Sequence, residues 1–159
     1  ADCGFIVRAY KGDVKFLAKK EIFKNKLFAK IVKSYGGIPI DRDNPDMKSI
    51  LEAIRTIKDG KKLCIFVEGT TNVLQEIKGD TSIFAVKAKC PIVPIMMLNK
   101  ARIFRRLKII IGKPFTLDEF YGVKLGDEEL EKMNSIVKEK MVEQQDLLKE
   151  IVASKKAKR

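Results

Sequence analysis

Short apolar runs alternate with amphipathic segments along most of the chain, and this alternation constrains the fold more than any other feature. Apolar runs predict strands at residues 14–18, 38–41, 63–67, 91–98 and 107–111. Apolar residues at helical spacing predict helices at 19–35, 46–58 and 81–89. Such alternation is typical of an α/β domain with helices flanking its sheet. We therefore expect a single domain over residues 1–159 with a largely parallel or mixed sheet.

Local signals refine this outline. Pro39 lacks a backbone N–H and marks its strand as an edge or terminal strand. Asp46 is placed to cap the helix at 46–58, whose expected buried stripe is Met47, Ile50, Leu51, Ile54 and Ile57. Gly126 precedes a long predicted helix at 127–152, and residues 153–159 form a basic tail. The apolar residues on or near one face of this helix are Leu130, Met133, Val137, Leu147, Leu148 and Ile151.

Polar residues follow two of the predicted strands. The run at 63–67 ends in Glu68, Gly69, Thr70 and Thr71, and the strand at 38–41 is followed by Arg42. Ligands of open α/β sheets bind outside the carboxyl ends of the strands. If the two strands are parallel neighbours, Arg42 and Glu68 open onto the same rim. The guanidinium of Arg42 is suited to binding a phosphate, and the alternative is that Arg42 is a solvated loop arginine. For Glu68, the alternative is an ordinary strand-to-loop junction without a binding role.

The charge of the chain favours an anionic partner, because its formal net charge is +12. Residues 8–33 hold nine Lys or Arg against Asp13 and Glu21, and Lys19 lies at the end of the first strand. This segment is either a solvated helix face or a surface that faces anionic lipid headgroups. A nucleic-acid-binding module is a third hypothesis, but no nucleic-acid motif is present, so no nucleic-acid partner is expected.

Histidine is absent, so no His general base, His metal ligand or Cys–His pair can be completed within these 159 residues. The three cysteines show no paired spacing, which predicts reduced thiols in a cytoplasmic setting. No apolar stretch is long enough for a membrane span, and we expect neither a transmembrane segment nor a signal peptide in this chain.

Several blocks in a fixed order resemble the glycerolipid acyltransferases, in particular the 1-acylglycerol-3-phosphate acyltransferases. Val14-Lys-Phe-Leu-Ala-Lys-Lys-Glu-Ile-Phe23 is similar to the segment after that family's first motif. Gly36-Gly-Ile-Pro-Ile-Asp-Arg42 resembles its second motif, which ends in a substrate-binding arginine. Phe66-Val-Glu-Gly-Thr70 resembles the third, and Cys90-Pro-Ile-Val-Pro94 the fourth. Lys108-Ile-Ile-Ile-Gly-Lys-Pro-Phe115 fits a strand near the family's C-terminus.

The resemblance implies a glycerol-3-phosphate acyltransferase-like fold and transfer of a fatty acyl group to a lysophosphatidic acid-like acceptor. The implied donor is acyl-CoA or acyl carrier protein, with no metal and no further cofactor. It also implies a peripheral location at the cytoplasmic face of an anionic membrane. In this scheme Lys19 and Arg42 attract phosphate, whereas Glu68, Gly69 and Thr70 shape the acceptor site. Thr71 stands where the family has a phosphate-holding arginine.

The family's first motif is a His, four residues and an Asp, with the His as general base. Asp2 matches the Asp, which places the His four positions before Ala1. Asp13 is a poorer match, because Arg8 then stands where the His belongs. Either the N-terminus is truncated or the protein has lost its base. The chain as given is therefore expected to be inactive, and a catalytically inactive relative that binds anionic lipid is the alternative.

Overall fold

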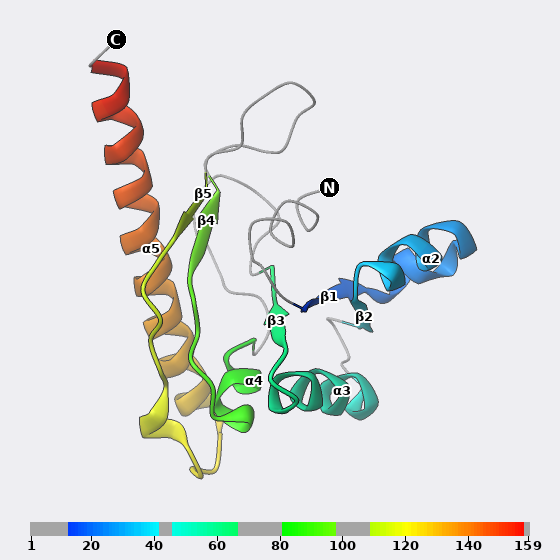
Figure 1. The fold of residues 1–159 in the computed structure, drawn as a ribbon. Helices are drawn as coiled ribbons and strands as arrows, with labels where there is room; N and C mark the ends of the chain where they lie inside the picture. Colours follow the sequence, from blue (N-terminus) through cyan, green and yellow to red (C-terminus); the bar gives the residue numbers. More distant parts are fainter. Residues whose placement is uncertain (1–12, 42–45, 67–80, 98–108, 158–159) are drawn as a thin grey trace. The chain divides into compact units, whose positions relative to one another are not determined.

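The computed structural model describes residues 13–41, 46–66, 81–97 and 109–157 (Figure 1). The chain divides into two compact units, Ala1–Val67 and Glu68–Arg159. Strands and helices occur in both units, so the predicted α/β fold class is confirmed. The prediction that residues 1–159 form one domain stays a prediction.

The first unit is built on a three-stranded parallel sheet. Its strands are β1 (Val14–Lys19), β2 (Gly37–Ile40) and β3 (Lys62–Cys64), in the spatial order β2-β1-β3. The central strand is largely buried, as expected for a parallel strand covered on both faces. Pro39 lies in β2, at an edge of the described sheet, as predicted.

Helices connect the parallel strands. The predicted helix at 19–35 is two elements, a 3₁₀ helix η1 (Lys20–Lys24) and the α-helix α2 (Lys26–Ser34). Asn25 separates them, because its extended backbone and its side chain begin a new helix. The Asn25 Oδ1 atom accepts hydrogen bonds from the backbone N–H groups of Leu27 at 3.0 Å and Phe28 at 3.4 Å.

The helix α3 (Met47–Lys58) begins after Asp46 as predicted, but its expected apolar stripe is wrong in part. Met47 is 67% exposed and Leu51 is 47% exposed. The buried residues are instead the smaller Ser49, Ala53 and Thr56. Ser49, Ala53 and Thr56 lie on one side of the helix, whereas Met47 and Leu51 lie on roughly the opposite side, so the covered face is not the one that holds these large apolar residues.

The second unit contains α4 (Thr81–Ala88), β4 (Ile95–Met97), β5 (Ile109–Ile111), η2 (Asp118–Phe120) and α5 (Asp127–Ala157). The strands β4 and β5 pair antiparallel as a separate two-stranded sheet. The strand predicted at 91–98 is therefore shorter than expected. The two sheets together fit the predicted parallel or mixed arrangement, with the parallel and antiparallel pairings in different units.

The core of the second unit forms around the first half of α5. Met133 is fully buried and Leu117 is 1% exposed, and both pack with Val86, Phe120 and Val137. In the second half of α5 the apolar face is partly exposed, because Leu147 is 43% exposed and Ile151 is 37% exposed. Both lie to one side of Leu148, which is the buried residue of that stretch.

The helix α5 also continues through Ala157, beyond the predicted end at residue 152. The residues of the predicted basic tail explain the difference. Alanine and lysine are good helix formers, and positive charge is favourable at a helix C-terminus. Most of the predicted tail is therefore helical.

Stability should fall at acid pH through Asp46. Its carboxylate accepts hydrogen bonds from the Ser49 backbone N–H at 2.9 Å and the Ser49 hydroxyl at 3.0 Å. These bonds, followed by the charge of Lys20, hold the pKa of Asp46 below its ordinary value of 3.8. A depressed pKa stabilises the folded state above the ordinary pKa, and this contribution is lost as the pH falls through the folded pKa.

Thermal unfolding across acid pH checks this prediction. Asp46→Asn keeps an oxygen for capping but removes the titration, so its melting temperature should depend less on pH than that of the unmodified chain. Equal pH dependence in the two proteins would contradict the assignment.

Candidate functional site at the carboxyl edge of the parallel sheet

The carboxyl ends of the three parallel strands define the candidate site. Lys19 ends β1 and is paired in register with Ile40, the last residue of β2. Because β3 also runs parallel to β1, the chain leaves all three strands at the same edge. Arg42 is two positions beyond Ile40, and Glu68 follows β3 by four positions. Lys19 and Ile40 therefore mark the described part of this edge.

The strand order decides a condition that the sequence left open. The strands that precede Arg42 and Glu68 are parallel, but they are not neighbours, because β1 lies between them. With about 4.8 Å between adjacent strands, β2 and β3 run roughly 10 Å apart. Lys19 ends the strand between them.

The start of η1 adds positive charge next to this edge. Lys19 and Lys20 are both exposed, and the charge of Lys20 contributes to the lowered pKa of Asp46, which begins α3. Lys20 therefore acts electrostatically on the residue that caps α3. Lys20 was not among the predicted site residues. Its position directly after the central strand was the signal that it belongs near the edge.

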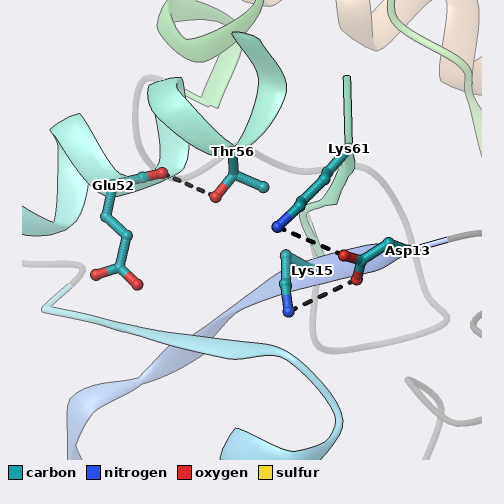
Figure 2. A network of polar contacts seen from close by, with 5 residues as sticks. All are labelled: Asp13, Lys15, Glu52, Thr56 and Lys61. Carbon is teal, nitrogen blue, oxygen red and sulfur yellow. Dashed lines mark hydrogen bonds and ion pairs between the residues drawn. The ribbon is translucent and has the colours of Figure 1, made fainter. Parts of the chain in front are cut away.

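Asp13 lies at the opposite end of the sheet. Figure 2 shows its carboxylate between Lys15 and Lys61, with an N–O distance of 3.6 Å in each ion pair. Its backbone oxygen accepts a hydrogen bond from the Lys62 N–H at 3.0 Å. Asp13 thus joins β1 to β3, about 20 Å along the strand from Lys19. This location argues against Asp13 as the partner of a catalytic base.

The same region contains a local contact within α3. The Thr56 hydroxyl donates a hydrogen bond to the backbone carbonyl oxygen of Glu52 at 2.8 Å (Figure 2). Thr56 is buried, and this bond satisfies its hydroxyl inside the helix. We assign Thr56 a structural role.

Most of the predicted site residues lie outside the described residues. These are Asp2, Arg42, Glu68, Gly69, Thr70 and Thr71. Lys19 is the predicted site residue that the structure describes. Within the described ranges, no group of three or more acidic, Cys or His side chains is placed to hold a metal. The expectation of a metal-free site stays a prediction.

Comparison with known proteins identifies the class of this chain. A family model described as acyltransferase matches residues 3–98, which is more than half of the sequence. The chain belongs to the acyltransferase family. The matched region of this acyltransferase chain includes all three strands of the parallel sheet and the segment at 68–71. The family assignment favours the lipid hypotheses over the nucleic-acid hypothesis.

Two curated relatives are similar to this acyltransferase chain. The 1-acyl-sn-glycerol-3-phosphate acyltransferase of Bacillus subtilis (strain 168) is 32% identical over 113 residues, covering 67% of this chain and 57% of the relative. The protein of the same name from Streptococcus pneumoniae is 31% identical over 121 residues, covering 73% of this chain and 45% of the relative. The chain spans about half the length of the curated relatives it matches.

A solved structure supports the fold of this acyltransferase chain. The 1-acyl-sn-glycerophosphate (LPA) acyltransferase from Thermotoga maritima aligns with a TM-score of 0.52 and 20% identity. The alignment covers 82% of this chain and 56% of that protein. The likeness confirms the predicted glycerol-3-phosphate acyltransferase-like fold.

Proposed function

We propose that this chain is the acceptor-binding part of a 1-acylglycerol-3-phosphate O-acyltransferase of phospholipid biosynthesis. One observation supports the proposal: Lys19 ends the central strand of the parallel sheet in register with Ile40, the last residue of the strand that precedes Arg42 in the sequence. Two cations around one sheet edge suit the phosphate of lysophosphatidic acid. The names of the two curated relatives support the same acceptor.

In the proposed reaction the free hydroxyl oxygen of the acceptor attacks the carbonyl carbon of an acyl thioester. The new C–O ester bond forms as the C–S bond breaks, and the leaving thiolate takes up the proton that the hydroxyl released. The donor is acyl-CoA or acyl-loaded acyl carrier protein, and no covalent enzyme intermediate forms. A His four positions before Ala1 removes the hydroxyl proton, and Asp2 orients that imidazole.

The acceptor in this proposal is a membrane lipid, and we place the protein at the cytoplasmic face of the membrane as a peripheral protein. Among the residues that the structure describes, no helix is both long and apolar enough to cross a bilayer. A catalytically inactive relative that binds anionic lipid is the second candidate. Thr71, at a position where the family motif has an arginine, favours it.

An acyl-transfer assay separates these candidates. Acyl-CoA and lysophosphatidic acid are mixed with the 159-residue chain or with an N-terminally extended form that carries the motif His, and released CoA thiol is measured. We expect phosphatidic acid formation by the extended form alone. Robust turnover by the 159-residue chain would refute the His-dependent mechanism. Binding of lysophosphatidic acid by both forms without turnover would favour the inactive relative.

Arg42→Ala in the extended form should weaken binding of the acceptor. Loss of a charge-assisted contact of about 1.5–3 kcal/mol raises the KM for lysophosphatidic acid roughly 10- to 150-fold. Arg55→Ala is the matched control, because Arg55 is an exposed arginine on α3. Steady-state kinetics at varied acceptor concentration check the prediction, and similar KM values for both variants would contradict a phosphate-binding role of Arg42.

A further inference from the structure

The segment from η1 to α2 exposes a cluster of large apolar side chains. Leu27 is 69% exposed, Phe28 56%, Tyr35 55% and Ile31 45%. Ile22 of η1 is 42% exposed. The structure describes twelve exposed large apolar residues, and five of them lie within residues 22–35. The exposure is therefore concentrated on one short segment of the first unit.

The exposed apolar residues of α2 share one face of the helix. Leu27, Ile31 and Tyr35 are spaced by four residues, and Phe28 lies three residues before Ile31. The helix meets the sheet through another side, where a Cβ at Gly37 would contact the Val32 side chain and, at 2.9 Å, its backbone oxygen. Within the described residues, packing against the sheet thus leaves this apolar face open.

The remaining side of α2 is strongly basic. Lys26, Lys30 and Lys33 recur at helical spacing and lie opposite the exposed apolar face. Residues 19–35 hold six lysines against a single acidic residue, Glu21. A helix with Phe and Leu on one face and Lys on the other has the composition of a helix that lies in the plane of a membrane interface.

We propose that α2 docks this protein onto an anionic lipid bilayer. Leu27, Phe28 and Ile31 enter the boundary between headgroups and acyl chains, and the Tyr35 ring lies at headgroup level. The lysine stems extend along the helix so that their ammonium groups reach lipid phosphates. Charge complementarity favours an anionic partner, because α2 carries three lysines and no acidic residue. The exposed Leu27, Phe28 and Ile31 need an apolar layer beside that anionic surface, and a bilayer supplies both.

This docking element is continuous with the candidate site. η1 begins at Lys20, directly after the Lys19 that ends the central strand, and Ile22 is exposed within η1. A bilayer in contact with η1 and α2 would therefore bring lipid headgroups near the carboxyl edge of the sheet. This inference rests on the proposed function in one respect, because the proposed lipid acceptor is the reason to expect a membrane as the partner. Its test measures binding and not turnover, so the two proposals fail separately.

The absence of tryptophan permits a clean fluorescence test. Phe28→Trp places a single reporter on α2, and Met47→Trp places a matched reporter at the 67%-exposed position on α3. With phosphatidylglycerol vesicles, we expect a blue shift of emission and protection from acrylamide for Phe28→Trp and little change for Met47→Trp. Equal shifts at both positions, or none at either, would overturn the proposal. Protection at position 28 without vesicles would show that protein already covers the face.

Vesicle co-sedimentation tests the two chemical components of the contact. Leu27→Ser combined with Ile31→Ser should lower the partition coefficient at least about tenfold, because apolar insertion is lost. Lys30→Glu combined with Lys33→Glu should lower the partition coefficient on phosphatidylglycerol vesicles by a similar factor. The same variant should change the partition coefficient on pure phosphatidylcholine vesicles little. Met47→Ser combined with Leu51→Ser is the control and should bind as the unmodified chain does. An equal loss in this control would refute the assignment to α2.

Discussion

Asp2→Asn in the N-terminally extended form should lower kcat by about two to four orders of magnitude. In the proposed mechanism the Asp2 carboxylate holds the upstream imidazole in the tautomer that accepts the proton of the acceptor hydroxyl. An amide of nearly the same shape lacks the charge that stabilises the imidazolium, so proton removal becomes slow. The KM for lysophosphatidic acid should change little, because the phosphate contacts are assigned to other residues. Steady-state kinetics with saturating acyl-CoA check both values.

Asp13→Asn is the matched control for this experiment. Asp13 lies at the amino end of β1, where its carboxylate pairs with Lys15 and Lys61 at 3.6 Å. These pairs are partly exposed and contribute little to stability, so the variant should fold and keep its turnover. A loss of kcat in Asp13→Asn as large as in Asp2→Asn would overturn the assignment of the motif Asp. A change confined to KM in Asp2→Asn would also contradict it.

Strand and helix positions were largely predictable where the local sequence pattern decides them. The β1 strand, the α3 helix and its Asp46 cap follow from apolar runs, helical spacing and capping chemistry. The division between η1 and α2 was missed because apolar periodicity continues through Asn25. The capping bonds of Asn25, which override that periodicity, depend on its backbone conformation.

The strand order was not predictable from the sequence. Nothing in the residues around Arg42 and Glu68 indicates that β1 separates their strands, because the order depends on how the connecting helices cross the sheet. The condition that the two flanking strands are neighbours is therefore not met, because β1 lies between them. The residues at 42 and 68–71 lie outside the described residues, and their roles stay predictions.

Burial was the least predictable property. Helical spacing correctly marked Met133 and Val137 as core residues, but the same rule placed Met47 and Leu51 in a buried stripe where Ser49 and Ala53 are found. The helical repeat of apolar residues identifies which residues share a face of the helix, whereas the packing of neighbouring elements decides which face is buried. The exposed face of α2 is the clearest case, because a regular apolar pattern there does not face the sheet.

Met133→Ala should destabilise the second unit by about 2–5 kcal/mol, since truncation of a buried Met leaves a cavity. Met133 is fully buried at the centre of the cluster with Leu117 and Phe120, and little space is available for relaxation. Met133→Leu preserves most of the volume and should cost less than about 1.5 kcal/mol. Met47→Ala, at a 67%-exposed position, should stay within about 0.5 kcal/mol of the unmodified chain. Urea unfolding followed by circular dichroism checks these values.

The same variant tests whether the two units unfold as one domain. In a Phe16→Trp background, the tryptophan replaces a 5%-exposed residue of β1 and its fluorescence reports on the first unit, whereas the long helix α5 makes circular dichroism sensitive to the second. If residues 1–159 form a single cooperative domain, Met133→Ala should shift both transitions to the same lower urea concentration. A shift seen by circular dichroism but not by fluorescence would show that the units unfold independently. Equal stability of Met133→Ala and Met47→Ala would contradict the assignment of Met133 to the core.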